Sequence, residues 1–472
     1  MVFSSNVFLI VFLPIFLICY FACPNRWRNL VLLLFSIGFY AYGAPTFVFL
    51  LLGSIVINFY LVKLMYKSEN QSHKKLFSGL AILFSLGLLI YFKYANFFVD
   101  NLNTLLSAVG LQPFTFAKVL LPIGISFFTF QSITYVVDAY RGNHPPMERL
   151  TDYMLYIIMF PQLIAGPIVR YCDIADEIRQ RKQNWAESLQ GFYRFVIGLS
   201  KKILVADVIG IQVDMLLSGD LTTMNTATAW IAIIAYTMQL YFDFSGYSDM
   251  AIGLGKIMGF HFPENFDNPY NSSSISEFWR RWHITLGTFM RNYLYIPLGG
   301  NRCSKPRMYF NLWVVFLLSG LWHGANWNFV LWGAYHGFWL VLERMGLCKF
   351  YEKIGKIPSV IITFIIVTVG WALFRINNIS EAFRFISRLF AFDFQTIIPI
   401  SSLHFCITLI VALFFAFFSL SSLGKKCQSL VFYTPFSKKQ HIAVWFVSVF
   451  MLIVCLSTLN AIGFSPFIYF RF

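Results

Sequence analysis

The stretch Ser319–Trp327, SGLWHGANW, decides how this chain folds, because it breaks a long apolar segment with two glycines, two polar residues and a histidine. The apolar segment covers 308–343, and basic residues lie on both sides of it, in 256–307 and in 344–356. Lys and Arg collect in cytoplasmic loops, so both ends of the segment are expected on the cytoplasmic side. The sequence therefore predicts a hairpin that enters the membrane and returns, with His323 near its turn.

A non-helical turn at membrane depth is tolerated only where protein buries it or where it lines a cavity. We therefore expect His323 to lie at the apex of the hairpin, inside the bilayer, and to face a cavity. An ionisable group at that depth is a candidate for function, and histidine can take a proton near neutral pH. The alternative is a neutral core histidine, bonded to a backbone carbonyl that the break leaves free. The segment 152–169, with FPQLIAGP in its second half, is a second candidate for a re-entrant segment.

The composition predicts an integral membrane protein: 58% of the 472 residues are hydrophobic and 12% are charged, against about 25% charged in soluble domains. We expect an all-α fold, with 1–472 forming a single polytopic membrane domain of about 11 to 13 apolar elements. The net charge of +15 fits basic cytoplasmic loops, and no compact basic domain is present to bind nucleic acid. The apolar elements are expected at 6–23, 29–43, 46–64, 76–98, 118–138, 152–169, 192–217, 226–244, 308–321, 325–343, 357–374, 402–422 and 441–463.

The N-terminal segment and the cysteines point to no processing or cross-linking. The apolar run Val7–Cys19 has neither a basic start nor a small-residue cleavage site, so we expect a retained first span. The eight cysteines form no CxxC pair and are interpreted as small core residues. His323 and His336 lack the i, i+4 spacing of metal ligands and have no acidic neighbour, so we expect no metal site. His336 is interpreted as a structural histidine.

The densest group of charges is FWRRWHITLGTFMRNYLYIPLGGNR, Phe278–Arg302. Ser274 and Glu277 have the spacing of a capping box, and the apolar residues from Ile275 to Tyr293 share one face of a helix. We expect an amphipathic helix at the cytoplasmic interface, with its arginines in water and His283 at the margin of the apolar stripe. The alternative is a plain interfacial anchor whose arginines bind lipid phosphate.

A second polar group lies in YFDFSGYSDMAIGLGKIMGF, Tyr241–Phe260. Asp243 and Asp249 are expected either to pair with Arg280 or Arg281, or to cap and orient helices. No strand precedes the GxG at 253–255, which disfavours a dinucleotide site. The chain has no GxSxG motif and no phosphate-binding loop, so an enzyme of this composition would depend on histidine acid/base chemistry.

Five segments together resemble the membrane-bound O-acyltransferase (MBOAT) superfamily, in the branch of the bacterial alginate O-acetyltransferase membrane component. They are FFTFQSITYVVDAYRG, FPQLIAGPIVRY, YFDFSGYSDMAIGLGKIMGF, FWRRWHITLGTFMRNYLYIPLGGNR and LWHGANWNFVLWGAYHG, and they follow one another in family order. The resemblance covers roughly 120–345, which we expect to be the catalytic core. It implies a multi-span helical fold with re-entrant hairpins and a central funnel.

The resemblance also implies a chemistry and a set of residues. The family's near-invariant histidine falls on His323 and its second histidine on His283, which makes these two the candidate catalytic residues. His323 would act as general base on an acceptor hydroxyl, and His283 would orient the donor or polarise its carbonyl. Arginines near the cytoplasmic mouth suit an anionic, phosphate-bearing donor. The candidates for donor contacts are Arg280, Arg281, Trp279 and Asn292.

No bound cofactor is expected. The donor would be acetyl-CoA or another acyl thioester, and the acetyl group would cross the bacterial inner membrane. A periplasmic or membrane-tethered partner, similar to an acetyltransferase or esterase, would then place it on an extracytoplasmic polysaccharide. Three alternatives stay open: D-alanyl transfer to teichoic acid, acyl transfer to lipid, and a transporter or scaffold without chemistry. The last is disfavoured because transporters often have two matching halves, which this sequence lacks.

Overall fold

The computed structural model describes residues 2–394, 402–463 and 467, and within these residues the chain is helical and has no strand. The chain divides into two compact units. The first unit combines Met1–Asn184 with Met258–Pro263, and the second combines Trp185–Ile257 with Glu264–Phe472. The all-α fold expected from the composition is therefore confirmed.

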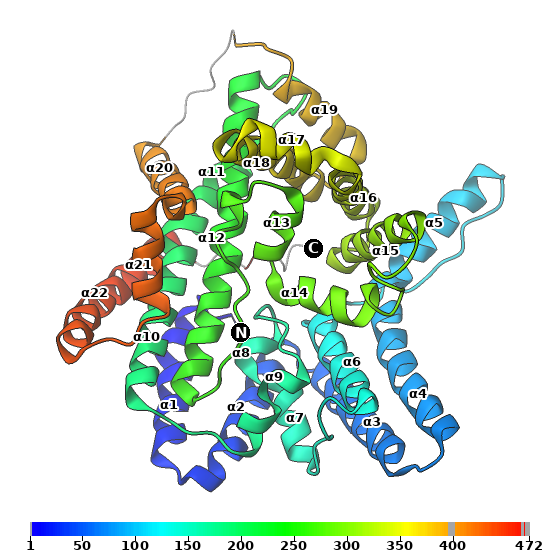
Figure 1. The fold of residues 1–472 in the computed structure, drawn as a ribbon, viewed down its shortest axis with the longest axis vertical. Coiled ribbons are helices and arrows are strands. Elements are labelled where there is room, and N and C mark those ends of the chain that lie inside the picture. Colours follow the sequence, from blue (N-terminus) through cyan, green and yellow to red (C-terminus); the bar gives the residue numbers. More distant parts are fainter. Residues whose placement is uncertain (1, 395–401, 464–466, 468–472) are drawn as a thin grey trace. The chain divides into compact units, whose positions relative to one another are not determined.

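The first unit is built from helices α1 to α9 (Figure 1). One π-helical turn, Val7–Phe12, directly precedes α1. A second, Ile90–Tyr94, joins α4 to α5. The nine helices are α1 (Leu13–Ala22), α2 (Arg28–Gly43), α3 (Phe47–Lys67), α4 (Gln71–Leu89), α5 (Ala95–Ala108), α6 (Ile125–Arg141), α7 (Leu150–Ile158), α8 (Phe160–Leu163) and α9 (Tyr171–Arg179).

The second unit contains the segments that carry the candidate catalytic histidines. Its helices are α10 (Trp185–Ser200), α11 (Asp207–Leu217), α12 (Thr226–Met258), α13 (Ile275–Arg281), α14 (Ile284–Phe289), α15 (Lys305–His323), α16 (Trp327–Leu342), α17 (Cys348–Ile354), α18 (Lys356–Arg375), α19 (Ile379–Leu389), α20 (Leu403–Phe417), α21 (Ser422–Phe432) and α22 (Lys438–Ile462). π-Helical turns follow α10, α14 and α16, at Lys201–Ala206, Met290–Tyr295 and Glu343–Leu347.

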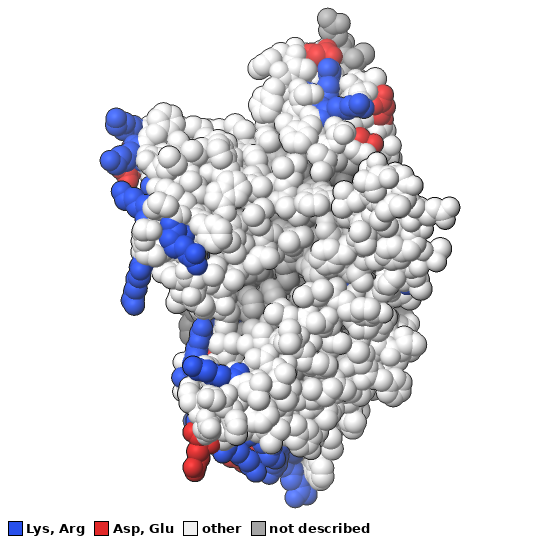
Figure 2. Space-filling view, turned by 90° about the vertical axis from the view of Figure 1, so that its right-hand side faces the viewer, with Lys and Arg blue, Asp and Glu red and all other residues white. Residues whose placement is uncertain are grey.

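Five helical segments within the described residues are long and apolar enough to cross a membrane. Many of their large apolar side chains are exposed, such as Phe49 and Leu403, as expected for surfaces that face lipid. Figure 2 shows a face on which most of the visible surface carries neither basic nor acidic side chains. The protein is therefore a multi-pass membrane protein. The five segments are Phe47–Lys67, Gln71–Ala108, Lys356–Arg375, Leu403–Leu420 and Lys438–Ala461.

The predicted hairpin is confirmed: α15 ends at His323, a short turn follows, and α16 begins at Trp327. The two helices pack side by side (Figure 1). Their backbones come so close that a Cβ atom on Gly320 would lie 2.2 Å from the carbonyl oxygen of Phe329. A residue with a side chain would push the helices apart, so glycine is needed here. The depth of this turn in the membrane stays a prediction.

The segment 152–169 is also broken, as its sequence predicts. Helix α7 ends at Ile158, and after the short α8 the chain is not helical again until Tyr171. The break leaves backbone groups without helical hydrogen-bond partners, and side chains bond some of them. Tyr156 Oη, for example, donates to the carbonyl oxygen of Val169 at 3.0 Å. These residues are buried within the first unit. Protein therefore covers this non-helical backbone, as a break at membrane depth would require.

The prediction of one amphipathic helix from Ile275 to Tyr293 is wrong. Helix α13 ends at Arg281, Trp282 is extended, and His283 adopts a left-handed conformation with φ of 47°. The chain turns here because it pairs with the loop before α13, where the Ile284 amide donates to the Asn265 carbonyl at 2.9 Å.

The break also changes what the apolar stripe contacts. Phe278 is 0% exposed and Trp282 is 1% exposed, and both rings pack against Trp371 of α18. These side chains therefore face protein, where the sequence alone suggested the membrane. The N-cap is confirmed, since the Ser274 hydroxyl accepts a hydrogen bond from the Glu277 amide at 3.0 Å.

Candidate active site

His283 lies in the tight turn between α13 and α14 and is 1% exposed. Its ring nitrogen Nδ1 is 3.0 Å from Oδ1 of Asn265. The same oxygen accepts a hydrogen bond from the Thr285 hydroxyl at 2.8 Å. The amide nitrogen of Asn265 donates to the Ser248 hydroxyl at 3.0 Å. The backbone and the side chain of Asn265 thus hold the turn and the ring together.

This network assigns the proton on the neutral imidazole. Because Asn265 uses its nitrogen to donate to Ser248, the oxygen that faces His283 is an acceptor, so Nδ1 carries the hydrogen. Nε2 then keeps a lone pair, and it is buried with no hydrogen-bond partner among the described residues. Burial lowers the pKa of His283 to about 3, so the ring is neutral near pH 7. His283 therefore offers a hydrogen-bond acceptor at Nε2.

His323 is the last residue of α15 and is 5% exposed. Its ring lies edge to face with Trp322 at 5.0 Å and with Phe374 at 5.2 Å between centroids. The indole of Trp322 also lies 5.9 Å from the ring of His283. The two histidines predicted to be catalytic are therefore both buried and both lie against the ring of Trp322, although 40 positions separate them in the sequence.

His336 in α16 is fully buried, and neither ring nitrogen has a hydrogen-bond partner among the described residues. Its ring contacts Trp279 at 4.9 Å and Trp332 at 5.0 Å between centroids. Trp332 also contacts His323, at 5.1 Å. His336 is thus enclosed by aromatic rings, which agrees with its interpretation as a structural residue.

The four candidates for donor contacts have different surroundings. Trp279 points its ring at His336, while Arg280 is exposed. Arg281 bonds Glu277 at 2.9 Å and lies 3.6 Å from Asp267. Asn292 accepts a hydrogen bond from its neighbour, Arg291. Their contact with a donor stays a prediction.

The expected pairing of Asp243 and Asp249 with Arg280 or Arg281 is wrong. Asp243 pairs with Lys202 at 2.9 Å, and Asp249 pairs with Arg194 at 2.9 Å and with Lys201 at 2.7 Å. The cause is the close packing of α10 on α12, where a Cβ on Gly198 would lie 2.5 Å from the Gly246 carbonyl oxygen. This contact brings basic residues of α10 and the turn after it to the carboxylates of α12.

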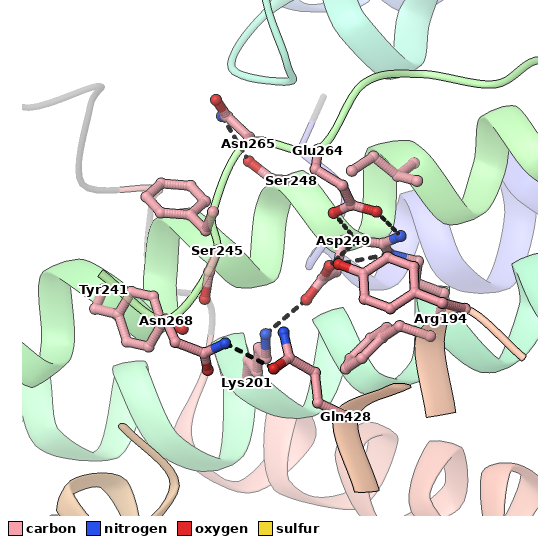
Figure 3. Close-up of a pocket in the computed structure, with 14 residues that line it drawn as sticks. Arg194, Lys201, Tyr241, Ser245, Ser248, Asp249, Glu264, Asn265, Asn268 and Gln428 are labelled. Carbon is pink, nitrogen blue, oxygen red and sulfur yellow. Dashed lines mark hydrogen bonds and ion pairs between the residues drawn. The ribbon is translucent and has the colours of Figure 1, made fainter. Parts of the chain in front are cut away.

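A cavity of about 70 Å³ lies in the second unit and shares two residues with the His283 network, Ser248 and Asn265 (Figure 3). Its other walls come from the end of α10, the middle of α12, the loop after it and α21. Sequence analysis missed Asn265, Arg194 and Glu264 as parts of the site. The signal in the sequence is the run ENFDN, 264–268, which places four polar residues between apolar segments.

Comparisons with known proteins identify the family of this chain. Residues 143–374 match the membrane-bound O-acyltransferase family. The chain is 41% identical to a probable alginate O-acetylase of Pseudomonas putida over 100% of both chains. It is 46% identical to a probable alginate O-acetylase of Pseudomonas aeruginosa over 83% of this chain and 75% of that one. It is 36% identical to a peptidoglycan O-acetyltransferase of Helicobacter pylori, over 81% of this chain and 79% of the relative.

Proposed function

Because the chain belongs to the membrane-bound O-acyltransferase family and is an acyltransferase, we propose that it moves acetyl groups from a cytoplasmic thioester toward an extracytoplasmic polysaccharide. The relatives named as alginate and peptidoglycan O-acetyltransferases support an acetyl group as the cargo and a polysaccharide as the acceptor. The observation that carries the proposal is the pair of buried histidines beside Trp322, one of which, His283, has an open hydrogen-bond acceptor.

His323 acts as the general base in this proposal. The acceptor hydroxyl gives its proton to His323 and attacks the thioester carbonyl, so that a C–O bond forms and the C–S bond breaks. The protonated imidazole then returns the proton to the departing thiolate. A thioester is already activated, so the protein has mainly to position the two reactants and to exclude water.

Of the two roles that the family resemblance implies for His283, orienting the donor and polarising its carbonyl, we propose only the first. To polarise the donor carbonyl, the ring would need a hydrogen on Nε2. Its hydrogen lies on Nδ1, which donates a hydrogen bond to Oδ1 of Asn265. The neutral ring can still orient a substrate by accepting a hydrogen bond from an N–H or O–H group at Nε2. We assign His283 this orienting role.

The proposal places the protein in the bacterial inner membrane. Thioesters of this kind are cytoplasmic, while the polysaccharide lies outside the membrane, so a second protein is needed to complete the transfer. That partner is expected to be periplasmic or tethered to the membrane and to resemble an acetyltransferase or esterase.

The test is NMR of the surface polysaccharide from cells that carry the wild-type protein or His323→Ala. We expect the acetyl signals of the polysaccharide to disappear in the variant, while membrane insertion and the amount of protein stay unchanged. His336→Phe is the matched control, because it also removes a buried imidazole beside Trp332. Acetyl signals of wild-type intensity in His323→Ala would overturn the proposal.

A further inference from the structure

We propose that Glu343 is a positioning residue for acetyl transfer: it places His283 by holding the start of α13 against the hairpin of α15 and α16. Glu343 directly follows α16, in the π-helical turn Glu343–Leu347. This inference rests on the proposed function, because it concerns how His283 is placed for that reaction. Glu343 acts through the position of α13 and not by contact with a substrate.

The carboxylate of Glu343 is buried and uses both of its oxygens on the backbone of α13. The residue is 3% exposed. The amide of Ile275 donates to Oε1 at 2.5 Å, and the amide of Ser276 donates to Oε2 at 2.9 Å. These amides belong to the first turn of α13, where N–H groups have no acceptor within the helix, and a negative charge is favoured at this end. Glu343 therefore fixes the place where α13 begins.

Helix α13 is too short to hold its own position. It has seven residues, and helices of this length are not stable in isolation. Its position depends on packing, since the ring centroid of Trp279 lies 5.4 Å from that of Phe316 in α15 and 5.5 Å from that of Trp332 in α16. Tertiary contacts therefore place α13 on the hairpin, and the two hydrogen bonds to Glu343 hold its first turn there.

The other end of α13 leads directly to His283. The carbonyl oxygen of Arg281 accepts a hydrogen bond from the Asp267 amide at 2.9 Å, and two residues later the His283 ring bonds the Asn265 side chain. Seven helical residues span about 10 Å, and a hydrogen-bonded helix transmits a displacement as a rigid element. A shift of the first turn of α13 therefore reaches the turn that carries His283.

Glu343 also connects the two candidate catalytic histidines. His323 is the last residue of α15, and α16 runs from the hairpin turn to Glu343. The two helices of the hairpin are in close contact, because a Cβ atom on Gly333 would lie 2.3 Å from the carbonyl oxygen of Phe316. The hairpin thus carries His323, and the carboxylate at its end holds the helix that leads to His283.

A double-mutant cycle tests whether Glu343 acts through His283. The readout is the initial rate of polysaccharide acetylation after induction in cells, per amount of inserted protein. Glu343→Gln keeps the size of the side chain but replaces one acceptor oxygen by an amide donor, so we expect a rate about tenfold lower. In the His283→Ala background the same change should alter the rate by no more than about twofold, because residues that act as a unit are not additive.

Asn378→Ala is the matched control. The Asn378 side chain accepts hydrogen bonds from the amides of Ser380 and Glu381, at 2.9 and 3.2 Å, in the first turn of α19. The variant therefore also removes two bonds to the start of a helix, but α19 carries no candidate catalytic residue. We expect the wild-type rate per amount of protein, even if Tm falls.

A second readout needs no turnover. ¹⁵N NMR of the imidazole nitrogens, with the full-length protein in lipid nanodiscs, reports on the eight histidines of the chain, and His283→Gln assigns the His283 signals. We expect these signals to shift in Glu343→Gln, because a displaced turn changes the hydrogen bond from Nδ1 to Asn265. They should keep their wild-type positions in Asn378→Ala.

A plain helix cap predicts the wild-type rate per amount of protein in Glu343→Gln, and that result would overturn the inference. An equal loss of rate in both backgrounds, or unmoved His283 signals, would overturn it as well. If Glu343→Gln does not insert, Glu343→Asp replaces it in both measurements, since its shorter side chain cannot reach both amides. Failure of the proposed function is separate: it leaves the acetyl signals unchanged in His323→Ala, while the imidazole spectra still decide on Glu343.

Discussion

His283 and His336 are equally buried, at 1% and 0% exposed, but their surroundings differ in kind. His283 has a partner for one ring nitrogen, in a network that continues through Asn265 to Thr285 and Ser248. His336 is surrounded by aromatic rings, and neither of its nitrogens is bonded among the described residues. Burial alone therefore does not identify a functional histidine. A network that fixes the tautomer, and leaves one nitrogen open, is the stronger indication.

The largest expected effect is a loss of activity that distinguishes His283 from His336. His283→Ala should lower the rate of acetyl transfer about 100-fold, because a misplaced reactant loses rate on this scale. The measurement is acetyl transfer by purified protein in nanodiscs. An activity within threefold of wild type would show that the open Nε2 atom has no part in the reaction.

The second prediction concerns the residue that makes the two regions different. Asn265→Asp replaces the amide by a carboxylate, which accepts from Nδ1 and raises the pKa of His283 by its charge. The ring should then become protonated at Nε2 in mildly acidic solution and lose its acceptor. We expect activity to fall from pH 8 to pH 6 and, below the new pKa, to fall about tenfold per pH unit, because the neutral fraction of the ring decreases by that factor.

The wild-type protein is the control for that pH profile. Its His283 has a pKa of about 3, so this ring stays neutral from pH 6 to pH 8. Identical profiles for Asn265→Asp and the wild type would contradict the assigned tautomer.

The third prediction concerns the aromatic side of the comparison. His336→Phe replaces an imidazole with two unbonded nitrogens by an apolar ring, a change that is nearly neutral or stabilising where no hydrogen bond is lost. We expect acetyl transfer within about threefold of wild type and an unchanged or higher Tm. A loss of activity as large as that of His283→Ala, in a folded variant, would place His336 in the reaction.

The smallest expected effect is on how the stability of the protein depends on pH. The pKa of His283 is about 3 in the folded protein against 6.5 for an ordinary histidine, so the unfolded chain takes up its proton first. Stability from this residue is therefore full above pH 6.5 and is lost as the pH falls toward 3. We expect Tm in detergent to decrease from pH 7 to pH 5, with a smaller decrease in His283→Gln. Equal slopes in the two proteins would refute this.

Several features of the fold follow from local sequence. The hairpin is predictable because Ser319–Trp327 breaks an apolar segment that has basic residues at both ends, and the helices end and begin within that stretch. The break in 152–169 is predictable from its prolines and glycine. Helix α18 lies within one residue of the expected span at each end, since a long apolar run allows few other structures.

Other features depend on contacts between distant segments. The 275–293 periodicity fits one helix, and the break at His283 comes from pairing with the loop around Asn265. Local charge suggested Arg280 and Arg281 as partners of Asp249, but Gly198 and Gly246 let α10 approach α12 and supply Arg194. Neither contact leaves a periodic signal in the sequence.

Hydropathy, charge and motif order are local properties, so the sequence alone predicts a helical membrane acyltransferase with His323 and His283 as the residues to consider. Contacts between distant segments assign the hydrogen on His283 to Nδ1 and bring both histidines against Trp322. Tertiary contacts also pair Arg194 and Lys201 with Asp249 in the wall of the neighbouring cavity. Hydrogen bonds and ion pairs depend on where distant side chains meet, and packing alone sets those positions.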